Sequence, residues 1–342
     1  MSTTSTAMPN DNYKIKNNNK NTNDMNTKTL FLAAAATMML AACTNDSDNN
    51  QKEEGQIYLT TADMQVTTRS TSQAILATQF DNGDQIDVFI KDAVDQETTQ
   101  PEQVYTQPLV YTADGNGNLT TTAKQYWPPY KRSISVWGVY PKGTAGTNIE
   151  STNISFSVKE DQTSADNYKA SDLMTGTAAN PVAQLETLQE IPLTFKHLLS
   201  KVNVNLSKTE ATTDISDADL ANAEIYIMST KPTTKFTPKS YTVNKADASG
   251  TAFTNGLHVC KGTTGSCIVV PQDMTAGDNL IKVLIGNDTF LYKVPAGGIS
   301  FEPQKLHTFN IKIHKANIIV TSTITAWTET TANDGTAILQ NP

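Results

Sequence analysis

The sequence predicts an all-β protein with two tandem β-sandwich domains. Runs of alternating apolar and polar residues recur after residue 57, and each has the length of a strand. Turn signals rich in Gly, Asn, Asp and Pro separate these runs, and no amphipathic pattern extends beyond about three helical turns. Regularly spaced short strands are typical of β-sandwiches. The expected strands are 85–90, 133–140, 154–158, 201–206, 224–228, 281–285, 290–294, 309–313 and 318–324.

Composition excludes several classes of protein. Of the 342 residues, 38% are hydrophobic and 18% charged, which is too polar for a protein with many membrane spans. The net charge is −8, so the chain has no basic stripe for phosphates and we expect no nucleic-acid partner. Three cysteines and four histidines leave little material for a metal cluster.

An apolar stretch near the N-terminus, residues 30–42 (LFLAAAATMMLAA), has the length of a signal-peptide core. A membrane-spanning helix needs about 20 apolar residues, so this stretch is too short to cross a bilayer. Lys28 supplies the positive flank before it. The stretch ends in Leu-Ala-Ala-Cys, which resembles the bacterial lipobox and places the modified cysteine at Cys43.

These features define the N-terminal organisation that we expect. Residues 1–24 are an extension ahead of the true start at Met25, and residues 25–42 are a lipoprotein signal peptide. Cleavage leaves Cys43 to carry acyl chains, which attach the protein to membrane lipid without a spanning helix. Residues 43–55 form a polar, acidic tether. The alternative is a buried cysteine at the end of a core helix.

The expected junction between the two sandwich domains is the polar segment 180–190. A new apolar block (IPLTFKHLLSKVNVNL) begins directly after it. The domains are therefore expected at 56–188 and 189–342, each within the usual size range. In the expected strand near residue 310, His307, Phe309, Ile311 and Ile313 share one face.

Cys260 and Cys267 are the two cysteines that lipidation leaves over. Outside the cytoplasm such a pair can oxidise to a disulfide, and Gly262 and Gly265 between them allow a tight loop. The alternative is two small buried residues. We expect no metal site, because a Cys-x6-Cys spacing is unusual for zinc and only His258 is close by.

Several blocks of sequence resemble the type V fimbrillins of the Bacteroidia, including their fimbrillin-like lipoproteins. Each block is weak evidence alone, but their order covers essentially the whole mature chain. After the lipobox and its acidic tether come 67–70 (TTRS), 80–89 (FDNGDQIDVF), 126–128 (YWP), 136–141 (VWGVYP), 170–174 (ASDLM), 193–202 (LTFKHLLSKV), 269–272 (VVPQ) and 323–327 (TITAW).

The resemblance implies a fimbrial subunit with two Greek-key, transthyretin-like sandwiches. In that family the precursor reaches the outer membrane and the cell surface as a lipoprotein. An Arg-specific protease then removes the first strand and leaves a hydrophobic groove. The C-terminal segment of another subunit fills this groove as a donor strand, which is β-augmentation. The implied partners are other fimbrial subunits of the same type, the Arg-specific protease and outer-membrane lipid. The implied role is structural and supports adhesion, without catalytic residues or cofactors.

The chain has two arginines, Arg69 and Arg132. Arg69 lies in a polar connection, where nicking is favoured, so we expect cleavage between Arg69 and Ser70. Arg132 lies in a short connection and is expected to be less accessible. Cleavage would release the first strand, 56–69, with its apolar residues Ile57 and Leu59. The alternative for Arg69 is an ordinary surface residue.

The expected donor strand is the C-terminal region 317–339, where one side of the strand pattern is more apolar. The alternative is that its strands complete their own domain. The segment after Trp327 is largely polar, which leaves a stalk, anchor or tip role open. The residues assigned to the donor are Ile318, Val320, Ile324, Trp327, Ile338 and Leu339.

Two other functions compete with the fimbrial interpretation. An enzyme would need a convergent set of reactive groups, and no Gly-x-Ser-x-Gly, His-Glu-x-x-His or phosphate-binding Gly loop occurs. A surface glycan-binding lipoprotein would share the lipobox and the sandwiches, with Tyr126, Trp127 and Tyr130 as a stacking platform. The segment 114–118 (DGNGN) begins like a calcium loop but departs from it at the later positions, so a hairpin turn is expected there.

Overall fold

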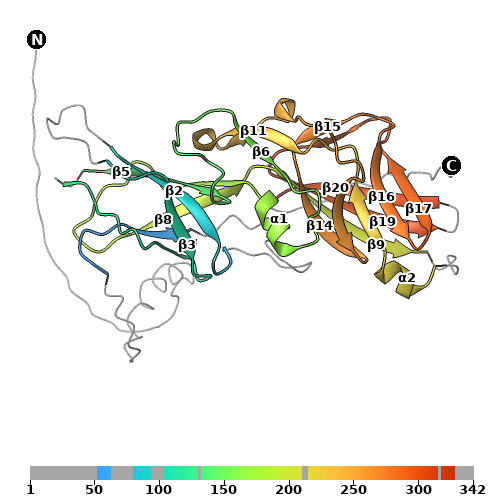
Figure 1. Ribbon diagram of the computed structural model, residues 1–342, viewed down its shortest axis with the longest axis horizontal. Helices are drawn as coiled ribbons and strands as arrows, with labels where there is room; N and C mark the ends of the chain where they lie inside the picture. Colours follow the sequence, from blue (N-terminus) through green and yellow to red (C-terminus); the bar gives the residue numbers. More distant parts are fainter. Residues whose placement is uncertain are drawn as a thin grey trace, which may run out of the picture. The chain divides into compact units, whose positions relative to one another are not determined.

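The computed structural model describes residues 52–62, 80–93, 104–129, 132–209, 215–314 and 317–327 of the chain. This described part is built mostly of β-strands, as Figure 1 shows, so the all-β prediction is confirmed. Its helical elements are short, namely α1 (Ala165–Ser171), α2 (Asp217–Ala221) and the 3-10 turns η2 (Pro238–Ser240) and η3 (Lys245–Asp247).

The N-terminal strands form a closed barrel in the order β1-β4-β3-β2-β5-β7-β8. Every neighbouring pair is antiparallel except β1 with β8, which is parallel. Each strand of the barrel therefore has a bonded neighbour on both sides. The strands are β1 (Tyr58–Thr61), β2 (Gln85–Asp92), β3 (Leu109–Ala113), β4 (Asn118–Thr120), β5 (Ile134–Tyr140), β7 (Met174–Thr177) and β8 (Glu190–His197).

The remaining strands form two four-stranded sheets and two smaller ones. The orders are β14-β9-β19-β20, β13-β10-β16-β17, β12-β11-β6 and β15-β18. The strands are β6 (Ile154–Ser157), β9 (Ser200–Lys208), β10 (Glu224–Ile227), β11 (Thr233–Thr237), β12 (Thr242–Val243), β13 (Leu257–Lys261), β14 (Thr264–Val269), β15 (Gln272–Met274), β16 (Asn279–Ile285), β17 (Asp288–Lys293), β18 (Ile299–Phe301), β19 (Lys305–His314) and β20 (Asn317–Ala326).

Two hydrophobic cores follow from this arrangement. The barrel core contains alternate residues of the barrel strands, and the second core is shared by the two four-stranded sheets. In β19 the predicted apolar face is confirmed, because His307, Phe309, Ile311 and Ile313 are each at most 1% exposed. Period-two alternation places such residues on one face of a strand.

Phe195 in β8 is the central ring of the barrel core. It packs edge-on against Phe80, with ring centroids 4.9 Å apart. Two glycines make room for it: a Cβ on Gly138 would lie 2.6 Å from the Phe195 ring, and one on Gly176 would lie 2.8 Å from it. Real Cβ atoms do not approach this closely, so the ring requires glycine at both positions.

The domain boundary at 188 and 189 stays a prediction, as does the number of Greek keys. β8 lies after that boundary and pairs with β1 and β7 in the barrel. β6 lies before it and pairs with β11. Alternation shows that one face of a strand is buried, but not which strands meet at their edges. For that reason the sequence pattern did not reveal the closed barrel.

Candidate functional site

β1 closes the barrel, and it is the strand on which the fimbrial interpretation depends. Leu59 pairs with Leu119 of β4 on one side and with Ile191 of β8 on the other. Ile57 and Leu59 are each 2% exposed and belong to the barrel core, while Tyr58 and the threonines of β1 are only half-buried. The strand therefore inserts alternate side chains into the core and bonds along both edges.

The residues just before β1 form a polar clamp, which we define as residues 52–57. Lys52 makes an ion pair with Glu190 at the start of β8. The Glu53 carboxylate makes an ion pair with Lys124 and accepts a hydrogen bond of 2.7 Å from the Tyr126 hydroxyl. These two hydrogen bonds hold the pKa of the Glu53 carboxyl below its usual value.

Backbone bonds hold the clamp to the connection between β4 and β5. The Trp127 amide donates to the Gly55 carbonyl over 2.9 Å, and the Ile57 amide donates to the Gln125 carbonyl over 2.8 Å. Continuing into β1, the Thr61 amide donates to the Gly117 carbonyl over 2.7 Å. The whole stretch from residue 52 to 61 is thus held by non-covalent contacts.

Arg132 is buried in the barrel. Its guanidinium makes an ion pair with the Asp92 carboxylate, and the residue is 6% exposed. A protease needs an exposed, extended backbone, so the bond after Arg132 is protected. Arg69, Ser70 and the lipidation residue Cys43 lie outside the described residues, and their roles stay predictions.

The described part of the expected donor segment completes its own sheet. β20 pairs antiparallel with β19 over the length of both strands, including Ile318 with Ile313. Val320 is 1% and Trp327 4% exposed in the second core, whereas Ile324 is 50% exposed. This is the arrangement of the alternative interpretation. Ile338 and Leu339 lie outside the described residues.

Three of the resemblance blocks meet in a buried polar cluster. The His197 Nδ1 atom lies 2.7 Å from the Asp172 carboxylate, and both residues are at most 5% exposed. The Trp327 indole stacks on the His197 ring, with centroids 4.0 Å apart and planes 15° apart. Burial lowers the pKa of the neighbouring Lys201 to about 8, against the opposing effect of Asp172. In the sequence, only the place of each residue in a block of the resemblance pointed to these positions.

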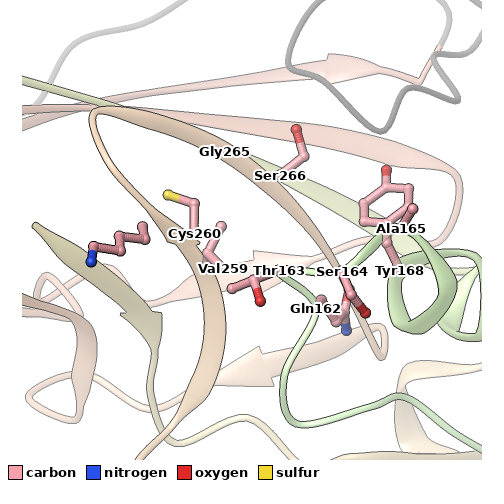
Figure 2. Close-up of a pocket in the computed structure, with 10 residues that line it drawn as sticks. Gln162, Thr163, Ser164, Ala165, Tyr168, Val259, Cys260, Gly265 and Ser266 are labelled. Atoms are coloured by element: carbon pink, nitrogen blue, oxygen red, sulfur yellow. The ribbon is translucent and has the colours of Figure 1, made fainter. Parts of the chain in front are cut away.

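Cys260 and Cys267 are both free and buried in the structure. Burial raises the pKa of the Cys260 thiol to about 12 and that of Cys267 well above its usual value, so both are protonated at neutral pH. Their pairing under oxidising conditions stays a prediction. Cys260 borders a pocket of about 230 Å³, and Figure 2 shows Ser266 and Tyr168 among its lining residues.

The other sequence features have structural roles. In the turn between β3 and β4, the Asp114 carboxylate accepts hydrogen bonds from the amides of Asn116 at 2.7 Å and Asn118 at 3.0 Å, as expected for a hairpin turn. Trp127 packs partly buried against the barrel core, and the hydroxyl of Tyr126, which is 46% exposed, donates to the Glu53 carboxylate of the clamp. Tyr130 lies outside the described residues.

Within the described ranges, no group of three or more His, Cys, Asp and Glu side chains is arranged to hold a metal ion. In the same part of the chain, no helix has the length and apolar character needed to cross a bilayer.

Comparison with known proteins identifies the family. A family model described as fimbrillin-like matches residues 68–327. The chain belongs to the fimbrillin-like family. This fimbrillin-like protein is similar in fold to a candidate cell adhesion protein from Bacteroides uniformis (TM-score 0.59, 18% identity), with 81% of this chain and 100% of that chain covered. A candidate cell adhesion protein from Bacteroides ovatus gives a TM-score of 0.59 at 16% identity, with 80% and 96% covered. A search of curated sequences found no match.

The resemblance to fimbrillins is therefore confirmed. Membership of the fimbrillin-like family indicates a structural subunit of fimbriae at the cell surface, whose partners are other fimbrial subunits. It points to a structural rather than an enzymatic role.

Proposed function

We propose that the protein is exported as a lipoprotein acylated at Cys43, cleaved after Arg69 and polymerised by strand exchange at the position of β1. The observation that carries this proposal is the closure of the barrel by a short strand near the N-terminus. β1 bonds to β4 and β8, and its residue Leu59 and the preceding Ile57 lie in the core. Cleavage after Arg69 would leave this strand attached by non-covalent contacts alone.

Loss of β1 would make the subunit reactive. It would leave unpaired backbone groups on β4 and β8 and expose the core beneath Ile57 and Leu59. Exposed apolar surface costs about 25 cal/mol per Å², and unpaired strand edges are templates for another strand. A donor strand from another subunit would restore both the backbone bonds and the buried side chains.

The donor is proposed to come from the C-terminal region 317–339 of another subunit. Since β20 already pairs with β19 and buries Val320 and Trp327, donation by 317–327 requires its release from its own sheet. Donation would therefore give up the antiparallel pairing with β19 in exchange for pairing with β4 and β8 of another subunit.

The proposal is tested by incubating the mature chain, which begins at Cys43, with an Arg-specific protease. We expect one cut after Arg69, none after the buried Arg132, and then a ladder of SDS-resistant oligomers. The matched control is Arg69→Lys, which keeps the charge but removes the cleavage site. A wild-type chain left intact at Arg69, or a cut chain that stays monomeric, would contradict the proposal.

A further inference from the structure

The clamp residues show what kind of strand fits the β1 position. Ahead of the two core residues Ile57 and Leu59, the clamp carries a cation and an anion in sequence, Lys52 and Glu53. Lys52 pairs with Glu190 on the β8 side, and Glu53 pairs with Lys124 and Tyr126 on the β4 side. Glu53 lies four positions before the first core residue, Ile57.

Removal of the first strand would take away Lys52 and Glu53. Their partners on the β8 and β4 sides would remain. Lys124 and Tyr126 would offer an ammonium and a hydroxyl donor on one side of the open groove. Glu190 would offer a carboxylate on the other side. The two sides thus carry opposite charge at the end of the groove where the N-terminal end of β1 lies.

We propose that this polar rim, formed by Lys124, Tyr126 and Glu190, selects the incoming donor strand by charge. The inference rests on the proposed strand exchange. The fitting strand has two apolar residues separated by one residue, as Ile57 and Leu59 are. It carries a carboxylate four positions before the first of them and a cation directly before that carboxylate. It runs parallel to β8, because a reversed strand would bring its other end to the rim.

The rim favours a donor segment that carries an acidic residue over β20 alone. The segment 317–327 contains no acidic residue and would leave Lys124 without a carboxylate partner, whereas the rest of the proposed donor region, 328–339, contains Glu329 and Asp334. Each pair at the rim is partly exposed, and exposed pairs contribute little affinity individually. Charge of this kind acts mainly on the choice of partner and on its rate of arrival.

The test uses the full chain after cleavage at Arg69 and a labelled peptide with the native sequence 51–62. A second peptide exchanges the charges, Lys52→Glu with Glu53→Lys, and a control peptide carries Glu54→Gln at an exposed position. Entry is followed by fluorescence polarisation. We expect the charge-exchanged peptide to bind about tenfold more weakly than the native one at low salt, and the control to match the native peptide. The difference should shrink at high salt, because salt screens exposed charges.

A reversed rim provides the decisive comparison. In a subunit with Lys124→Glu and Glu190→Lys, the preference between the two peptides should invert. Equal entry of native and charge-exchanged peptides would overturn charge selection while leaving strand exchange intact. If none of the peptides enters the cleaved subunit, the groove does not open, and the proposed function fails with it.

Discussion

Truncation of Leu59 to alanine tests whether β1 holds the barrel closed. The side chain is 2% exposed and belongs to the barrel core. Loss of a buried leucine side chain costs 2–5 kcal/mol, so we take about 3 kcal/mol. In the uncut chain this loss should lower the free energy of unfolding. In the chain cut after Arg69, the same loss should weaken the binding of the cleaved segment to the rest of the subunit. The segment should therefore dissociate about 100-fold faster.

Two measurements check this prediction. Urea unfolding of the uncut protein reports the loss of stability, and native mass spectrometry after cleavage follows release of the cleaved segment. The matched control is Thr60→Ala in the same strand, whose side chain is half-buried and lies outside the core, so a change within about 0.5 kcal/mol is expected. Equal release from the two variants would refute the idea that core burial retains β1.

Three further changes address the interior, each measured by urea unfolding. Burial lowers the pKa of His307 to about 4, so the folded state resists protonation and stability should fall by about 2 kcal/mol from pH 7 to pH 5. His307→Phe should remove this pH dependence, and an unchanged profile would contradict it. Gly176→Ala should destabilise the barrel by about 1–3 kcal/mol through its contact with Phe195, and Phe195→Leu in the same chain should recover part of the loss. His197→Asn removes the ring that stacks on Trp327 and contacts the buried Asp172 carboxylate, and it should cost about 1 kcal/mol or more; a neutral result would show that the stack and the Asp172 contact together contribute nothing.

Local pattern was enough to predict much of the fold. The alternation in β19 predicted one buried face with Phe309, Ile311 and Ile313, because side chains of a strand alternate between its two faces. The hairpin turn at Asp114 followed from its Gly- and Asn-rich sequence. These features depend on residues that are neighbours in the chain.

Features that join distant segments were not visible in the sequence. Arg132 lies in the expected connection before β5, and its guanidinium pairs with Asp92 of β2 in the interior. The sequence around Arg132 or around Asp92 does not indicate that the two residues form an ion pair. Likewise, Asp172, His197 and Trp327 come from three separate blocks, and only the folded chain shows that they touch.

The parallel pairing of β1 with β8 has a consequence for the order of events during folding. Leu59 of β1 pairs with Ile191 of β8, the last barrel strand in the chain. The barrel can therefore close only after most of its other strands have been made and placed. Until then the edges of β4 and β8 are open to a strand from another chain. The chain's own first strand then has the advantage of a covalent tether, which gives it an effective concentration of roughly mM. Under the proposed strand exchange, this tether would favour closure of the barrel by the chain's own first strand over pairing with a neighbouring subunit.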